Sequence, residues 1–306
     1  MLFLRHLSGR RPPLNLKDAI ERHTSTLETS GRSKGTLRTY RWHFELLRKF
    51  FSPERDVQDI THDDVVSYLK HLQRKRMSES TLNVAKAALA GLFEYLVEAG
   101  HLEKKPFKKM SYDKIVRRSP RVLDSGERRA VLAAALTPLH RFLFRVYLDL
   151  GLRLSEAMNL NVADFADTDV VRVIGKGKKI RKLAIPPPLR EAFLGWLPER
   201  EKRLAKSRRR TGRTKVDQRA LFITEWGTRM NSRTAQRQVK EVLKSIGLPD
   251  VRVHNLRHTL GKRLAIEGVH PRTIQDILGH ANLSTTEIYT PTTRTDIRDA
   301  LNSLGN

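Results

Sequence analysis

With 306 residues, the chain is long enough for two domains that each bury a hydrophobic core. Hydrophobic residues make up 39% and charged residues 30%, a composition typical of globular proteins that excludes a largely disordered chain. No apolar run reaches the roughly 18 residues that a spanning helix needs, so we expect no membrane partner. Because cysteine is absent, disulfides, a thiol nucleophile and cysteine-ligated zinc are excluded, and a cytoplasmic location is expected.

Positive charge is the strongest feature of the composition. The chain has 59 Lys and Arg residues against 33 Asp and Glu residues, a net charge of +26. Such a charge opposes folding by self-repulsion unless a polyanion neutralises it. Nucleic acid is the first candidate, since each neutralised phosphate releases condensed counterions. An anionic membrane surface and the ribosome are alternatives that charge alone does not exclude.

The first hundred residues show the spacing of amphipathic helices. Behind Ser33, a typical N-cap, apolar residues recur at intervals of three and four. Arg38 and Arg41 lie outside this apolar face and are candidate DNA contacts. Thr61 and Asp64 open another helix, and two more are expected near 16–27 and before Gly100. The sequence thus predicts a four-helix N-terminal domain over residues 1–103.

Residues 104–121 lose this periodicity and are strongly basic. We interpret them as an interdomain linker that lies along a polyanion, with Arg118 and Arg121 as candidate DNA contacts. The alternative is a solvated tether with no binding role.

The second domain is expected over residues 122–306. It opens with Asp124 and Glu127 in capping-box spacing, and a strongly apolar helix follows and stops at Gly151. Between Val170 and Ile185 the pattern changes to alternation about a Gly-Lys-Gly-Lys turn, which predicts a β-hairpin.

A basic insertion covers residues 200–215. It holds nine basic residues and one acid, and this composition predicts a mobile loop rather than packed structure.

Four segments of this domain concentrate phosphate-binding and proton-transfer side chains. In the first, Arg153 stands at the junction of two helices, where a planar guanidinium suits phosphate oxygens and Glu156 is placed to brace it. In the second, Lys176 and Lys178 occupy the hairpin tip, and Lys178 is a further candidate DNA contact. The spacing of a nucleotide-binding loop is missing there. Taken singly, an exposed helix-end arginine and a soluble turn explain these two segments equally well.

The third segment is a helix that carries His254, Arg257 and His258. His254 and Arg257, three residues apart, share a face and can reach one ligand together. The two histidines have the spacing of a metal pair, but no glutamate follows His254 and no third ligand is evident. We therefore expect no metal site.

The fourth segment begins with a short helix over 271–278, closed by Gly279 as a C-cap. His280 follows directly. Ser284 and Glu287 then form a capping box that places Tyr289 early on the next helix. By itself, such a tyrosine is more often an amphipathic core residue.

In this order, the four segments resemble the catalytic domain of the tyrosine recombinases, the integrase family that includes the Xer recombinases. The N-terminal half resembles that family's core-binding domain. The resemblance implies a mainly α fold with a small β-sheet, in which a SAM-like helical domain and an α/β catalytic domain form a C-shaped clamp on DNA. The matching residues are Arg153, Lys176, His254, Arg257, His280 and Tyr289.

The resemblance also implies a reaction. Tyr289 attacks phosphorus, His254 binds the phosphate or takes the tyrosine proton, and Lys176 protonates the departing 5′ oxygen. The product is a 3′-phosphotyrosyl bond, so neither a metal nor another cofactor is expected. The donors that surround the phosphate are Arg153, Arg257 and His280.

Double-stranded DNA and three further copies of the chain are the implied partners. Four protomers would exchange strands through a Holliday junction, in integration and excision or in dimer resolution. An apolar stripe over 297–304 is expected to pack on a neighbouring protomer, although packing on its own domain is the alternative. Two other readings remain open: a type IB-like topoisomerase, and a DNA-binding protein without activity.

Overall fold

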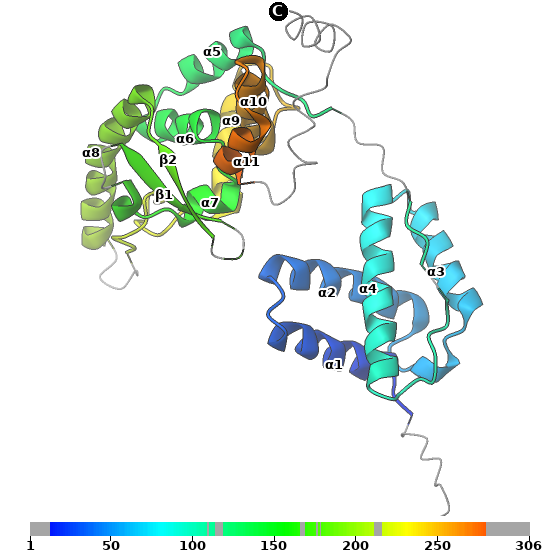
Figure 1. The fold of residues 1–306 in the computed structure, drawn as a ribbon. Helices are drawn as coiled ribbons and strands as arrows, with labels where there is room; N and C mark the ends of the chain where they lie inside the picture. The colour runs from blue at the N-terminus through cyan, green and yellow to red at the C-terminus, as the bar shows by residue number, and fades with distance from the viewer. Residues whose placement is uncertain are drawn as a thin grey trace, which may run out of the picture. The chain divides into compact units, whose positions relative to one another are not determined.

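The computed structural model describes residues 13–108, 110–113, 119–165, 169–175, 177, 179–210 and 216–279. The chain divides into two compact units, Met1–Arg117 and Arg118–Asn306. Figure 1 shows the helices and strands of both units. Each unit has its own hydrophobic core. In the part of the chain that the structure describes, every helix is too short or too polar to cross a lipid bilayer.

Within its described residues, the N-terminal unit consists of four α-helices and one short 3-10 turn. The helices are α1 (Leu16–Thr29), α2 (Lys34–Phe51), α3 (His62–Arg74) and α4 (Glu79–Glu98), and the 3-10 turn is Val57–Asp59. The predicted N-caps are present. The Ser33 hydroxyl accepts a hydrogen bond from the Thr36 backbone amide, and Thr61 forms a capping box with Asp64. The apolar faces meet in a core that includes Phe44, Leu47, Tyr68, Leu72, Leu92 and Phe93.

The chain after α4 stays attached to this unit. Phe107 is buried in the helical core, the Lys86 ammonium on α4 lies 2.8 Å from the Asp113 carboxylate, and Lys105 pairs with Glu94. Part of the segment predicted as a linker therefore packs on α4. Basic residues dominate the composition of this segment, and Phe107 is the apolar residue that attaches it to the helical core.

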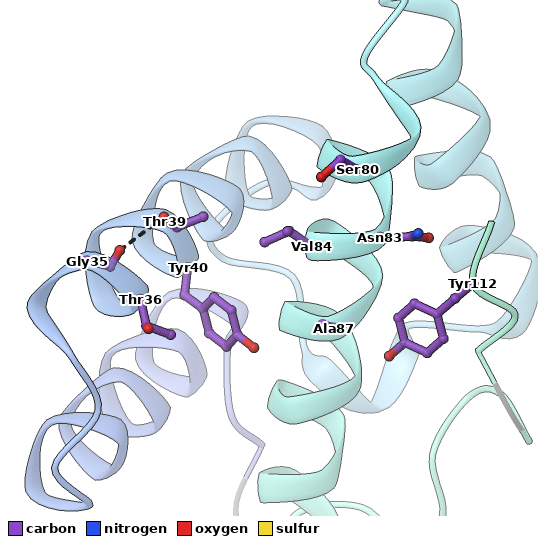
Figure 2. A pocket seen from close by; sticks show the side chains of 9 residues that line it. All are labelled: Gly35, Thr36, Thr39, Tyr40, Ser80, Asn83, Val84, Ala87 and Tyr112. Carbon is purple, nitrogen blue, oxygen red and sulfur yellow. Dashed lines mark hydrogen bonds between the residues drawn. The ribbon is translucent and has the colours of Figure 1, made fainter. Parts of the chain in front are cut away.

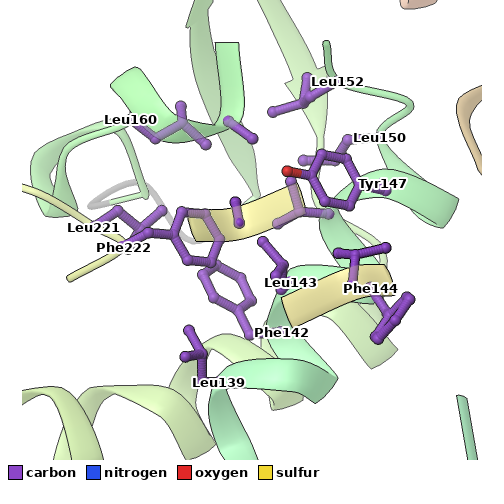
Figure 3. Packing of buried hydrophobic residues seen from close by; sticks show 14 of the residues in the cluster. Leu139, Phe142, Leu143, Phe144, Tyr147, Leu150, Leu152, Leu160, Leu221 and Phe222 are labelled. Carbon is purple, nitrogen blue, oxygen red and sulfur yellow. The ribbon is translucent and has the colours of Figure 1, made fainter. Parts of the chain in front are cut away.

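The second unit is organised around α6. Its helices are α5 (Ser125–Ala134), α6 (Pro138–Asp149), α7 (Leu154–Asn159), α8 (Pro187–Arg210), α9 (Ser232–Ser245), α10 (Val253–Ile266) and α11 (Pro271–Leu278), with a 3-10 turn at Val162–Phe165. Helix α6 is buried because it packs against α5, α8, α9 and α10. The Phe142 ring stacks on Phe222 with ring centres 5.1 Å apart, in a core that continues through Leu143 and Tyr147 (Figure 3).

The predicted hairpin is present. Strands β1 (Val170–Ile174) and β2 (Ile180–Ala184) pair antiparallel. Val171, Val173 and Leu183 are buried against the core, whereas Ile174 and Ile180 are exposed. Arg181 lies directly opposite Val173 and therefore faces inward, because side chains alternate between the two faces of a strand.

The prediction of a mobile loop from residue 200 onward is wrong for 200–210, because α8 continues to Arg210. Arg200 is only 3% exposed and donates to the carbonyl oxygens of Ala220 and Gln218 at 2.9 and 2.5 Å. Leu204 is also buried, one helical turn further on. The basic composition of 200–210 conceals a helical spacing that buries Arg200 and Leu204 on one face. Residues 211–215 of the insertion lie outside the described residues.

Candidate active site

Two predicted arginines meet at the C-terminal end of α11. Arg153 precedes α7 and donates from Nη2 to the carbonyl oxygen of Gly279 at 2.6 Å. Arg257, on α10, donates from Nη2 to the carbonyl oxygen of Leu278 at 2.5 Å, and from Nη1 to that of Gly151. Residues far apart in the sequence thus converge on two consecutive carbonyls.

Gly151 allows this convergence. Its φ of +60° belongs to the left-handed region that glycine adopts at little cost. A Cβ atom there would lie 2.6 Å from Leu278 Cδ2 and 2.9 Å from Leu260 Cδ2. The turn between α6 and α7 therefore fits against α10 and α11 only without a side chain at this position. This close approach brings Arg153 to the end of α11.

The Glu156 carboxylate binds the guanidinium groups of Arg153 and Arg181. Its carboxylate is nearly buried and accepts from the Arg153 backbone amide at 3.0 Å and from Arg153 Nη1 at 2.7 Å. It also accepts from Arg181 Nη1 and Nη2 at 3.2 and 2.8 Å. Burial by itself raises the pKa of Glu156, but the hydrogen bonds and charges of Arg181 and Arg153 outweigh it and hold the pKa below its usual value. Glu156 is therefore ionised at neutral pH.

Arg181 is a residue that the sequence analysis missed. It stands at an inward-facing position of β2, opposite Val173, where an unpaired charge is rarely tolerated. Once the hairpin is predicted, this alternation indicates that Arg181 needs a buried partner. The sequence alone does not identify Glu156 as that partner.

His254 lies at the solvent-facing edge of the cluster. Its side chain is exposed, and its ring centre lies 4.3 Å from that of His258. Partial burial lowers the pKa of His254, and the positive charges of Arg257 and Arg153 lower it further. At neutral pH the imidazole is therefore uncharged and able to accept a proton.

The cluster has a surplus of positive charge. Arg153 and Arg181 share one carboxylate, that of Glu156, and Arg257 adds a third guanidinium, which donates to the carbonyl oxygens of Gly151 and Leu278. Arg153 is about one-third exposed at its side chain, whereas Arg257 is 1% exposed. Such an arrangement suits an anion such as a phosphodiester, and its accessible side chains are those of Arg153 and His254. Within the described ranges, no group of three or more His, Asp or Glu side chains is placed to hold a metal ion.

Three predicted catalytic residues lie outside the described residues. They are Lys176, His280 and Tyr289. Their neighbours in the sequence are informative, because Gly175 and Gly279 are both described and directly precede Lys176 and His280.

The predicted DNA contacts differ in their surroundings. Arg38 is exposed on α2, and Arg41, on the same helix, pairs with Glu28. Arg121 is engaged within the second unit, where its guanidinium pairs with Glu127 and lies 3.2 Å from Asp250. We therefore assign Arg121 to the packing of this unit rather than to DNA. Lys178 and Arg118 lie outside the described residues.

A pocket of about 510 Å³ opens between α2 and α4 of the N-terminal unit. Figure 2 shows Tyr40 reaching from α2 towards α4, while Tyr112 comes from the segment that follows α4. The first turns of both helices contribute to the lining, through Thr36 and Ser80. The pocket therefore lies where the amino ends of two helices meet.

Two family models match the chain. Residues 121–295 match the phage integrase family, and residues 20–100 match the N-terminal SAM-like domain of phage integrases. Together they span both units.

Two curated relatives agree with these matches. Tyrosine recombinase XerC of Roseiflexus castenholzii is 30% identical over 297 residues, covering 94% of this chain and 87% of the relative. Tyrosine recombinase XerA of Pyrococcus horikoshii is 29% identical over 289 residues, with 93% and 92% covered.

The solved structures share the fold. The XerH site-specific recombinase bound to a palindromic difH substrate superposes with a TM-score of 0.70 at 19% identity, covering 99% of both chains. The Tn1549 transposon integrase in complex with transposon right end DNA has a TM-score of 0.73 at 19% identity, covering 96% of this chain and 100% of that one. By its matched family models and its curated relatives, this chain belongs to the phage integrase family, the tyrosine recombinases.

Proposed function

We propose that the protein is a site-specific DNA recombinase that cuts and rejoins DNA through a 3′-phosphotyrosyl intermediate. The observation that carries this proposal is the convergence of Arg153 and Arg257 on the carbonyl oxygens of Gly279 and Leu278. Both guanidinium groups are thereby anchored at the turn that leads into His280. The surplus positive charge around Glu156 makes this turn attractive to the negative charge of a phosphodiester.

The chemistry follows from the charge on the substrate. The anionic oxygens of a phosphodiester repel a nucleophile, so most of the catalytic benefit comes from cationic donors around the pentacoordinate phosphate. Arg153, Arg257 and His280 supply these donors. The phenol oxygen of Tyr289 attacks phosphorus, and its proton passes to the neutral imidazole of His254.

The bond between phosphorus and the 5′ oxygen then breaks, and Lys176 protonates the departing oxygen. The phosphotyrosyl bond retains the energy of the original phosphodiester. The 5′-hydroxyl of a second strand can therefore attack it and release Tyr289, with no need for ATP or a metal ion.

We assign residues 1–103 to core-site DNA binding, 104–121 to a basic connection and 122–306 to catalysis. The first turns of α2 and α4 support the assignment of DNA binding, because helix N-termini attract phosphates and both line the pocket that contains Thr36 and Ser80. Arg38 is exposed on α2, between the pocket residues Thr36 and Thr39 in the sequence, and adds a positive charge to this helix.

The reaction needs several copies of the chain. One solved relative is a lambda integrase tetramer bound to a Holliday junction. We propose that four protomers of this chain likewise join two DNA sites and exchange strands through such a junction. The protein would act in the cytoplasm, in integration and excision or in the resolution of DNA dimers.

Covalent capture tests this proposal and identifies the DNA site in the same experiment. Purified protein is incubated with a pool of nicked duplexes of random sequence, and adducts that survive denaturing electrophoresis are sequenced. We expect adducts with the wild-type protein and none with the Tyr289→Phe or Arg153→Ala variants. The enriched site should then support strand exchange between two plasmids.

Two outcomes contradict the proposal. Specific binding without any adduct would leave only a DNA-binding protein. An adduct that relaxes plasmids lacking the enriched site, without strand exchange, would indicate a topoisomerase.

A further inference from the structure

The guanidinium of Arg181 lies between two glycines that each precede a proposed catalytic residue. A Cβ atom built on Gly175, next to Lys176, would lie 3.4 Å from Arg181 Nη1. A Cβ atom on Gly279, next to His280, would lie 2.9 Å from Nη1 and 3.1 Å from Cζ. A Cβ atom on Gly279 would therefore press on the guanidinium, whereas one on Gly175 would lie at ordinary van der Waals distance. The absence of a side chain at Gly279 leaves the guanidinium room to lie directly against the end of α11.

Arg181 also joins three elements by hydrogen bonds. From β2, its Nη1 and Nη2 donate to the Glu156 carboxylate on α7, at 3.2 and 2.8 Å. Its Nε donates to the carbonyl oxygen of Ile277 at the end of α11, at 3.2 Å. Only 14% of the side chain is exposed. A planar fork with this many donors fixes the orientation of its strand as well as its position.

The rest of the hairpin is held differently. Val171, Val173 and Leu183 pack into the general core, and such contacts are non-directional. On β1, Arg172 donates to the Asp164 carboxylate at 3.3 and 3.2 Å, which joins the hairpin to the 3-10 turn rather than to α7 or α11. Lys182, the next residue after Arg181, is exposed on the outer face of the sheet. Directional bonds from β2 to both α7 and α11 are thus supplied by Arg181, as far as the described residues extend.

We propose that Arg181 is a positioning residue for the cleavage reaction. It fixes the β1–β2 hairpin against α7 and the end of α11, and thereby sets where the hairpin tip delivers the proton of Lys176 to the leaving oxygen. All three nitrogens of its guanidinium are engaged with Glu156 and Ile277. A contact between Arg181 and the phosphate would instead slow the cleavage of a phosphodiester and of a 5′-bridging phosphorothiolate alike. The inference rests on the proposed function.

The expected effect follows from the geometry of proton transfer. A general acid must lie within hydrogen-bond reach of the atom that it protonates, and a misplacement of about 1 Å costs roughly 10²-fold in rate. Loss of Arg181 would loosen the hairpin while Arg153 and Arg257 keep their own bonds to Gly279, Leu278 and Gly151.

A sulfur leaving group isolates this step. In a substrate with a 5′-bridging phosphorothiolate, the leaving group departs without a proton, because thiols are much stronger acids than alcohols (a cysteine thiol has a pKa of about 8.5). Single-turnover cleavage of this substrate and of the normal phosphodiester is compared for Arg181→Ala, Arg181→Lys and Lys176→Ala. Lys182→Ala is the matched control, which removes an exposed charge from the neighbouring position.

We expect Arg181→Ala to cleave the phosphodiester about 10²-fold more slowly than wild type and to recover most of that loss on the phosphorothiolate, as Lys176→Ala should. Arg181→Lys keeps the charge but not the fork, so it should show the same pattern with a smaller loss. Lys182→Ala should cleave both substrates at nearly the wild-type rate.

Other outcomes separate the inference from the proposed function. Absence of cleavage by the wild-type protein would overturn the proposed function, and lack of rescue for Lys176→Ala would overturn the role of that lysine. With both of these intact, normal cleavage by Arg181→Ala, or an equal loss on the two substrates, would overturn the inference alone. If Arg181→Ala fails to fold, Arg181→Lys decides by the same criteria.

Discussion

Among the described residues of the catalytic unit, Arg257 is the least exposed charged side chain. It is 1% exposed and donates to the carbonyl oxygens of Gly151 and Leu278. A lysine has a single donor point in place of a planar fork and cannot span both carbonyls in the same way.

We predict that Arg257→Lys lowers the rate of covalent adduct formation roughly 10²–10³-fold and the free energy of unfolding by about 1–2 kcal/mol. Arg252→Lys, at an exposed position before the same helix, should change neither. Single-turnover cleavage and thermal unfolding measure the two effects. Unchanged cleavage by Arg257→Lys would contradict the role of the fork.

His23 is a buried histidine of the N-terminal unit, packed against the rings of Phe44 and Tyr95. Burial lowers the pKa of His23 to about 4, from an ordinary value of 6.5. The folded state therefore binds this proton less readily than the unfolded chain. The contribution to stability is fully present above pH 6.5 and is lost progressively as the pH falls towards 4, by up to roughly 3 kcal/mol.

We predict that His23→Phe weakens this pH dependence. Hydrogen exchange of the α1 and α4 amides in the full chain, at pH 7 and pH 5, measures the pH dependence of stability within the N-terminal unit. Wild type should lose protection at pH 5, and His23→Phe should lose less. Burial also lowers the pKa of His43, so part of the loss should remain. Equal losses in the two proteins would contradict the prediction.

At the residue scale, the sequence indicates candidate site residues only where a recognisable motif contains them. Arg153, His254 and Arg257 are candidates because they lie in short motifs at the expected spacing. Arg181 lies outside these motifs, and its importance depends on Glu156 and on the end of α11. Those contacts arise from folding, so local pattern could not reveal them.

Helix α8 shows how burial can reverse a compositional prediction. Arg200 lies inside the unit and donates to the carbonyl oxygens of Ala220 and Gln218. Arg208, two turns further along, is exposed.

We predict that Arg200→Ala lowers the free energy of unfolding by about 2–4 kcal/mol, because it leaves these carbonyls without their charged donor. Arg208→Ala should lie within about 0.5 kcal/mol of wild type. Chemical denaturation of the full chain compares the two. Similar stability of both variants would mean that 200–210 behaves as the loop that its composition indicated.

At the element scale, local signals were sufficient for most of the fold. Ser33, Thr61 and Asp124 cap the helices that they were expected to open, and the Gly-Lys turn joins two paired strands. Capping and alternation depend on residues within a few positions of each other. The long helix α8 was not predicted in full because its buried face becomes evident only with its partners in place.

At the scale of the whole molecule, the net charge of +26 predicts DNA binding that weakens strongly with salt. Each neutralised phosphate contributes about 0.9 to the slope of log K against log salt concentration. Arg38 is exposed whereas Arg121 is paired with Glu127, and this difference makes the slope informative.

We predict that Arg38→Ala reduces the slope by about 1, since Arg38 is exposed on α2. Arg121→Ala should leave the slope unchanged and reduce stability instead, because Glu127 and Asp250 already neutralise Arg121. Fluorescence anisotropy over a series of salt concentrations measures both slopes. A smaller slope for Arg121→Ala alone would reverse the two assignments.

Mass spectrometry of the covalent adduct is the most direct test of the central claim that Arg153 and Arg257 hold one phosphate for attack by Tyr289. The adduct with the captured DNA site is digested with protease and nuclease, and the peptide that bears a nucleotide is sequenced. We predict a nucleotide joined through its 3′-phosphate to Tyr289, and no such peptide from Arg153→Ala or Arg257→Ala. A nucleotide on another residue, or one joined through a 5′-phosphate, would contradict the mechanism.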